Sequence, residues 1–323
     1  MNKLLTTAVL INTMTFAHHG VAILGVSGPE GPGAPLETTG SMTLPEGKTF
    51  AYIKVDAASF EKYTQARDDE GDSLNFRTYG FGYGFTSYLS AYIFLPYYTK
   101  TLENSRATSG FHDIRITGVL GFKYDEGFML TPDSESLDDL GDWHFSAFVN
   151  MSLPTGDTDI KDADGSLYDA GMQLGFGQPS LMIGLSASKW LTEDWTFLTD
   201  LSYNTFLENE YSDGSKVLFG DEARINASLT YKLYGNTEGF RLELGVEANY
   251  MHLGRDVADG VPELATGGYI LYNTTGLRFY YNTISAGLGV KTPIYTDLNE
   301  GSLQQGSEGK ENYRIIFAFS TLF

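Results

Sequence analysis

The sequence predicts an all-β protein: a single transmembrane, antiparallel, up-and-down β-barrel of about twelve strands. Three observations support this. From Phe50 onward, runs of about ten residues alternate apolar and polar side chains and are separated by turns rich in Gly, Asn or Asp. The last run, Tyr313–Phe323, carries an apolar stripe and ends on an aromatic residue. After the N-terminal segment, no apolar run reaches the roughly 18 residues that a membrane-spanning helix needs.

The N-terminal segment has the features of a secretory signal peptide. A basic start, Met1-Asn2-Lys3, precedes the mostly apolar stretch Leu4–Phe16. Small residues follow at Ala17 and Ala22, and each offers a cleavage position. We therefore expect residues 1–22 to be a signal peptide that is cut near 17 or near 22.

The next segment, residues 23–48, is expected to be an extended arm. It contains four prolines among several glycines, and this composition cannot sustain the hydrogen-bond ladder of a sheet. Two locations stay open at this point: the periplasm, or the inside of the barrel, where the arm would act as a plug. Residues 49–323 are then the barrel itself.

Twelve strands can be placed by alternation, and an even number is what bacterial barrels require. We expect them at residues 50–62, 74–85, 89–98, 111–123, 143–153, 180–190, 195–206, 222–233, 240–252, 269–280, 283–292 and 313–323. Connections after even-numbered strands are short, except for 124–142, and those after odd-numbered strands are long. This asymmetry is typical of barrels with short periplasmic turns and long extracellular loops.

The second strand is ambiguous. Asn75 and Arg77 share the parity of its aromatic residues, such as Tyr79 and Phe81, and would face lipid with them. A bulge near Thr78 would reconcile the polar and aromatic residues.

Periodicity alone does not tell whether the apolar face of each strand points outward or inward, because a soluble β-sandwich would turn its apolar face inward. The signal peptide, the strand count and the terminal Phe323 favour the membrane. We therefore expect the outer membrane of a Gram-negative bacterium. The expected partners are outer-membrane lipids and lipopolysaccharide, together with the barrel-assembly machinery, which would recognise Phe323.

Composition excludes several classes of function. A net charge of −20 argues against nucleic acid as a partner, and the absence of cysteine excludes disulfides and thiolate metal sites. The acidic loop 157–165 has enough carboxylates for a cation such as calcium, but Lys161 interrupts it and the EF-hand spacing is missing. A solvated loop is the main interpretation, and we assign no metal and no cofactor.

Alternation also assigns polar side chains to the lumen, where function is to be sought. Both charge signs occur there, which allows either a network that fills the barrel or a lined permeation path. Tyr92 and Phe94 offer an aromatic surface to a hydrophobic solute, or simply pack. Lys54, Asp56 and Lys291 face inward as well. The candidate path residues are Tyr92, Phe94, Arg115, Asn150, Asp200, Arg224, Glu243, Glu247, Arg278 and Arg314.

A catalytic alternative comes from His144-Phe145-Ser146, which has the His-x-Ser spacing of outer-membrane lipid hydrolases. The pair lies on the polar face, away from a lipid substrate, and the Asn-Gly that follows the phospholipase motif is replaced by Ala147-Phe148. We therefore predict no enzymatic activity.

Four segments together resemble a known family. They are Thr86–Tyr92, Leu95-Pro96-Tyr97, Gly110–Arg115 with its continuation Gly121–Tyr124, and Leu153–Asp157. The chain is similar in these to the outer-membrane transporters named for the meta-pathway of phenol degradation. The resemblance implies a barrel that moves small, often aromatic or hydrophobic compounds.

We expect a passive outer-membrane channel for such solutes. The alternative is a structural or interaction barrel with a closed, charge-filled lumen. Among the motif residues, Pro96 and Pro154 are expected at strand ends, where a missing N–H does no harm.

Overall fold

The computed structural model describes residues 34–60, 73–102, 106–133, 141–235, 239–299 and 310–323. The predicted signal peptide, 1–22, lies outside the described residues, as does the first part of the arm, 23–33. Among the described residues, no helix is both long enough and apolar enough to cross a membrane.

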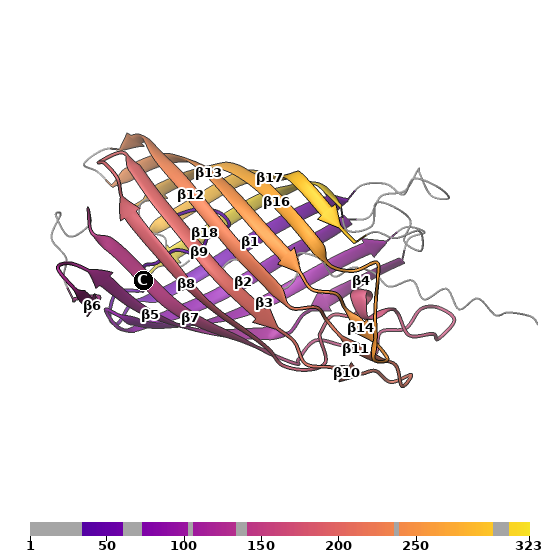
Figure 1. Cartoon of the computed structure of the whole chain (residues 1–323). Coiled ribbons are helices and arrows are strands. Elements are labelled where there is room, and N and C mark those ends of the chain that lie inside the picture. Colours follow the sequence, from indigo (N-terminus) through magenta and orange to yellow (C-terminus); the bar gives the residue numbers. More distant parts are fainter. Residues whose placement is uncertain (1–33, 61–72, 103–105, 134–140, 236–238, 300–309) are drawn as a thin grey trace, which may run out of the picture.

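Twelve antiparallel strands close into a barrel, as predicted (Figure 1). They are β1 (Thr49–Phe60), β2 (Ser73–Thr86), β3 (Leu89–Leu102), β5 (Ile114–Tyr124), β7 (Trp143–Leu153), β8 (Ser180–Trp190), β9 (Trp195–Thr205), β12 (Glu222–Gly235), β13 (Phe240–Leu253), β16 (Gly268–Tyr281), β17 (Ile284–Leu298) and β18 (Glu311–Leu322). Each pairs with its sequence neighbours, and the first strand pairs with the last, with Phe50 opposite Leu322. Within the described residues, each of these twelve strands therefore has two neighbours, and the wall they form is closed.

Apolar side chains point out of the barrel and polar side chains point into it, as in a membrane barrel. On β12, Ile225 and Leu229 on the outer face are 53% and 39% exposed, whereas Arg224 and Ser228 on the inner face are 8% and 2% exposed. An apolar exterior around a polar interior is the reverse of a soluble sandwich and suits a lipid environment.

Short elements extend the barrel at both ends. β6 (Phe128–Leu130) pairs with β5 at the end where the C-terminus lies, so the long connection after β5 contains a short hairpin. At the opposite, outer end, β10 (Asn209–Glu210), β11 (Lys216–Leu218), β14 (Val257–Ala258) and β15 (Val261–Pro262) form a separate small sheet. The long loops there also contain a 3-10 turn, Ala170–Met172.

The bulge proposed near Thr78 is wrong. The β1–β2 register is continuous, and the only irregularity in the β2–β3 pairing lies between Gly84 and Thr86. Arg77 consequently points outward, where its guanidinium carbon lies 6.0 Å from the centre of the Tyr97 ring. An aromatic face supports this exposed cation near the outer end of β2.

Pro96 lies inside β3 and not at a strand end, whereas Pro154 directly follows β7 as expected. Opposite Pro96 the neighbouring strand is broken: β4 (Arg106–Phe111) stops before His112 and β5 begins at Ile114. The His112 N–H still reaches the Pro96 carbonyl at 2.8 Å. The missing proline N–H therefore faces a gap in the ladder, where it breaks no regular bond.

Candidate functional site

Of the described part of the arm, residues 34–44 lie inside the barrel, and the exposed residues 45–48 form the turn that leads into β1. Residues 34–44 reach wall residues of β1, β3, β8, β9, β13, β16 and β17 through the contacts described below. Of the two locations left open by the sequence, the lumen is the one observed.

Glu247 on β13 binds the arm backbone. Its carboxylate accepts the N–H groups of Leu36 (2.6 Å), Glu37 (3.2 Å) and Thr38 (2.7 Å), and also the Thr38 hydroxyl (2.7 Å). Successive backbone N–H groups that converge on one anion form a nest. The arm is thus shaped around a wall carboxylate that is only 2% exposed.

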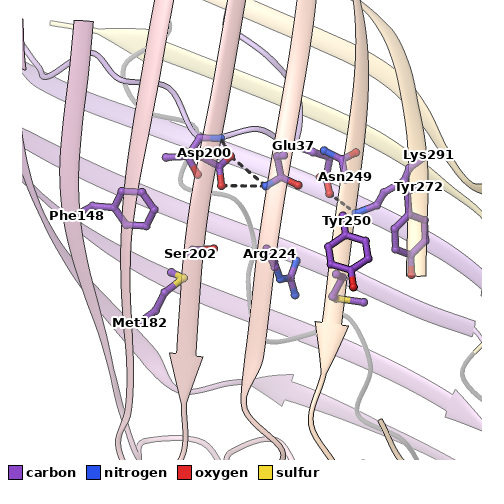
Figure 2. A pocket seen from close by; sticks show the side chains of 13 residues that line it. Glu37, Phe148, Met182, Asp200, Ser202, Arg224, Asn249, Tyr250, Tyr272 and Lys291 are labelled. Carbon is purple, nitrogen blue, oxygen red and sulfur yellow. Dashed lines mark hydrogen bonds and ion pairs between the residues drawn. The ribbon is translucent and has the colours of Figure 1, made fainter. Parts of the chain in front are cut away.

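Asp200 on β9 makes a second anchor of the same kind. It accepts the Thr39 N–H at 2.7 Å and both of its oxygens lie 3.0 Å from Asn226 Nδ2 (Figure 2). Hydrogen bonds to an ionised acceptor are stronger than neutral ones. Two acidic wall residues therefore hold four consecutive residues of the arm, 36–39.

At Glu37 the charges are reversed, because here the arm supplies the carboxylate and the wall supplies the cations. Its carboxylate pairs with Lys54 on β1 and with Lys291 on β17, the latter at 2.6 Å. Lys54 Nζ also lies 3.6 Å from Asp56, and Lys291 Nζ lies 4.4 Å from the centre of the Tyr272 ring. All of these charges are buried, so each depends on its partner.

Leu36 occupies a recess made by three inward-facing glycines: Gly276 on β16, and Gly287 and Gly289 on β17. A Cβ atom on Gly276 or Gly289 would clash with Leu36 Cδ1, and one on Gly287 would lie 2.7 Å from Leu36 Cδ2. Glycine inside a strand often marks such a close approach. Arg278 closes this end by donating to the Pro35 carbonyl at 2.8 Å.

The rest of the arm descends toward β1. The Ser41 hydroxyl contacts the Ser188 hydroxyl on β8, and the Leu44 N–H donates to Ser90 Oγ at 2.8 Å. Leu44 is fully buried against an aromatic cluster formed by Phe50, Tyr52, Tyr92 and Phe94. Within that cluster, the Tyr92 and Phe94 rings are stacked with centroids 6.1 Å apart.

The space left in the lumen beside the arm is small. A cavity of about 20 Å³ lies between Glu37, Asp200, Arg224 and Lys291 (Figure 2). One water needs about 10–15 Å³ on this measure. The cavity is therefore sized for one or two water molecules.

All ten predicted path residues face inward and are buried, at 8% exposure or less. The structure brings Asp200, Glu247 and Arg278 onto the arm and places Tyr92 and Phe94 in the aromatic cluster. The other five lie elsewhere on the wall, with these contacts: Asn150 to Thr117 (2.6 Å), Arg224 to Glu222 (3.1 Å), Glu243 to Arg241, Arg314 to Glu311, and Arg115 beside Phe94 in the strand register. Their role in solute passage stays a prediction.

Leu36, Glu37 and the glycine recess were not among the site residues predicted from the sequence. A signal was present, because Gly276, Gly287 and Gly289 share the lumen parity of Arg278 and Lys291. Nothing in the sequence, however, pairs an extended arm with a particular wall position.

Two family motifs meet at the outer end. Asp113, from the Gly110–Arg115 segment, accepts the N–H groups of Gly156 and Phe176, each at 2.8 Å. Thr155, beside Gly156, accepts the Ile114 N–H at 2.9 Å. A side chain on Gly156 would collide with the Leu174 carbonyl. These motif residues therefore fold the loop after β7 back over the barrel wall.

The outer loops enclose a second cavity of about 230 Å³. Its lining includes Asp169, Asp256 and Glu263 beside Tyr211 and Phe219. Phe219 also packs against Phe176 and Phe206, with centroids 5.3 Å and 5.9 Å away. The outer mouth thus combines an acidic surface with an aromatic cluster.

The residues of the two other candidate sites, the His144/Ser146 pair and the acidic loop 157–165, contact neighbouring side chains and backbone groups. Ser146 Oγ lies 2.7 Å from Ser186 Oγ, and His144 Nδ1 lies 3.3 Å from the Asp142 carbonyl. In loop 157–165, Asp159 pairs with Lys161 at 3.1 Å and Asp162 accepts two backbone N–H groups. Across the described ranges, no group of three His, Asp or Glu side chains is placed to hold a metal ion.

Comparison with known proteins fits this architecture. Residues 70–291, more than half of the chain, match the family model described as "Putative MetA-pathway of phenol degradation". The chain belongs to this family. Among curated proteins, none matches it in sequence.

Among solved structures, this member of the phenol-degradation family is similar to an outer membrane channel from Pseudomonas putida F1. The TM-score is 0.66 at 16% identity, and the match covers 88% of this chain and 98% of that one. The β-domain of the Bordetella autotransporter BrkA gives a TM-score of 0.48 at 8% identity, with 86% and 100% of the two chains covered. The first likeness shows the shared barrel fold.

Proposed function

We propose that this protein is an outer-membrane channel for the passive uptake of small aromatic or hydrophobic solutes, with residues 34–44 as its removable plug. The observation that carries the proposal is how the lumen is closed. The arm, and not the wall alone, fills it, and non-covalent polar contacts hold the arm there. Family membership and the fold shared with a Pseudomonas putida channel support the same function.

The aromatic cluster supports the solute class. Phe50, Tyr52, Tyr92 and Phe94 cover one side of the lumen, and Leu44 of the arm lies against them. When the arm leaves, these rings become a surface for apolar solutes. Export by residues 1–22 and assembly through Phe323 belong to the same proposal.

An engineered disulfide tests the plug directly, because the chain has no cysteine of its own. The contacting hydroxyls of Ser41 and Ser188 place their Cβ atoms within reach of a disulfide. The variant Ser41→Cys/Ser188→Cys should show no conductance steps in a planar bilayer when oxidised, and steps should return on reduction. Ser41→Cys alone is the control and should not respond to redox state.

Two results would count against the proposal. Conductance that is the same in the oxidised and reduced double variant would exclude the arm as the plug. An absence of conductance in the wild type and in the reduced variant would favour the alternative, a structural barrel with a closed lumen.

A further inference from the structure

We infer that the lumen contains a binding site for small solutes that carry a carboxylate beside an apolar group, and that the arm occupies this site as an internal ligand. The inference rests on the proposed channel function and specifies its solute class. Leu36 and Glu37 are the two adjacent arm residues that supply these groups.

The carboxylate half of the site is cationic once the arm leaves. Lys54, Lys291 and Arg314 contribute three positive charges around Glu37, and Asp56 and Glu311 contribute two negative ones. Glu37 makes this cluster neutral. Its departure leaves one positive charge in excess, and an uncompensated buried charge is strongly unfavourable. A carboxylate from solution can take the place of Glu37 on the two lysines.

The apolar half is the glycine recess. Leu36 fills space that Gly276, Gly287 and Gly289 leave open because they carry no Cβ. The recess lies on β16 and β17, and Lys291 lies on β17 two residues beyond Gly289 and therefore on the same face. The site thus suits one small molecule with a branched alkyl group or an aromatic ring next to its carboxylate.

Carboxylates on nearby strands orient such a solute, since Glu247 on β13 lies two strands from Lys291 with Thr274 between them in the register. Glu247 and Asp200 bind arm N–H groups and lose these donors when the arm leaves, while Asp200 keeps its contact with Asn226. They repel a carboxylate from β9 and β13 and leave Lys54 and Lys291 as its place of binding. A neutral molecule of the same shape gains nothing from the two lysines.

Benzoate and benzamide are a matched charged and neutral pair for the test. In the full-length chain, Glu37→Gln removes the internal carboxylate and weakens the hold of Lys54 and Lys291 on the arm, so that the arm can leave the site. Benzoate should raise the temperature at which this variant loses its folded gel mobility, and benzamide should not. The apparent affinity for benzoate should exceed that for benzamide by about tenfold, a factor equivalent to about 1.4 kcal/mol.

Lys291→Met added to Glu37→Gln should abolish the benzoate effect, and Lys54→Met serves if that variant does not fold. Lys123→Met is the control, because Lys123 is a buried lumen lysine that pairs with Asp142 at 3.5 Å. It should leave the benzoate effect intact. Equal shifts with benzoate and benzamide, or no shift with benzoate, would overturn the carboxylate site.

Flux through liposomes distinguishes this inference from the proposed function. Passage of benzoate and benzamide at the same rate through Glu37→Gln, without selective stabilisation, leaves the channel standing and removes the site. Selective stabilisation by benzoate without passage of either compound leaves the site standing and removes the channel.

Discussion

Thr38 is bound to Glu247 twice: its backbone N–H and its hydroxyl each donate to the Glu247 carboxylate at 2.7 Å. This pair joins the arm to the middle of β13. Because the carboxylate is buried, its loss weakens several charge-assisted bonds at once.

We therefore expect Glu247→Gln to release the arm and raise the open fraction at least tenfold, since a hydrogen bond to a charged group contributes about 1.5–3 kcal/mol. Single-channel recording measures this fraction. The matched control is Glu222→Gln, a lumen glutamate paired with Arg224 at 3.1 Å. If both variants open equally, general loosening of the wall explains the effect and the Thr38 contact does not.

Gly287→Ala tests the recess without altering charge. The new methyl would lie 2.7 Å from Leu36 Cδ2, and the arm must shift or leave. We expect more channel opening and a thermal midpoint close to wild type. Adding Leu36→Ala makes room for the methyl group and should restore closure. Failure of this second substitution to reverse the first would mean that the recess does not seat the arm.

Asp113→Asn should loosen the loop after β7. Each carboxylate oxygen of Asp113 accepts one of these N–H groups, so an asparagine places an N–H donor against the N–H group of either Gly156 or Phe176. An unsatisfied buried donor costs about 1–3 kcal/mol. Hydrogen exchange at Gly156 and Phe176 should speed up by about tenfold or more. Asp164→Asn, an exposed position in the same loop, should leave both amides unchanged.

Leu229→Arg tests the lipid-facing surface. Leu229 lies midway along β12 on the outer face and is 39% exposed in the isolated chain. An arginine at the bilayer midplane costs about 2–4 kcal/mol, falling to about 0–1 kcal/mol near the interface. Leu233→Arg, near the end of the same face, should therefore cost much less. Urea unfolding in liposomes measures the difference, and equal costs would contradict the membrane placement of β12.

The outer loops should be more stable in mild acid. Burial raises the pKa of Asp256 from 3.8 to about 6, and the neighbouring Glu222 and Glu263 act in the same direction. A raised folded-state pKa means that the stabilising contribution is full below about pH 4 and is lost as the pH rises through 6. Amides of β14, corrected for intrinsic rates, should exchange faster at pH 7.5 than at pH 5. Asp256→Asn should remove this dependence, and an unchanged dependence would assign it to another group.

The sequence alone determined the wall of the barrel. Each strand carries a local period-two pattern, and this pattern gives the number and the positions of the strands. Because lipid surrounds the barrel, the apolar face must point outward, and Arg224 and Arg278 therefore point inward. The parity of β2 placed Arg77 outward, but a bulge near Thr78 was wrongly expected, because the aromatic neighbour that accommodates Arg77, Tyr97, belongs to another strand. Pro96 was misplaced for a similar reason, since the gap that accommodates it belongs to the next strand.

Only the tertiary structure decided what fills the lumen. Leu36 and Thr38 bind Glu247, which lies 211 and 209 positions away in sequence, and Glu37 binds Lys291, which lies 254 positions away. An extended segment has no periodicity that predicts such partners. Closure of the barrel brings Lys54 from its beginning beside Lys291 near its end, and Glu37 lies between them. The local alternation of apolar and polar residues thus determines the barrel wall, whereas ion pairs between residues distant in sequence determine the position of the arm.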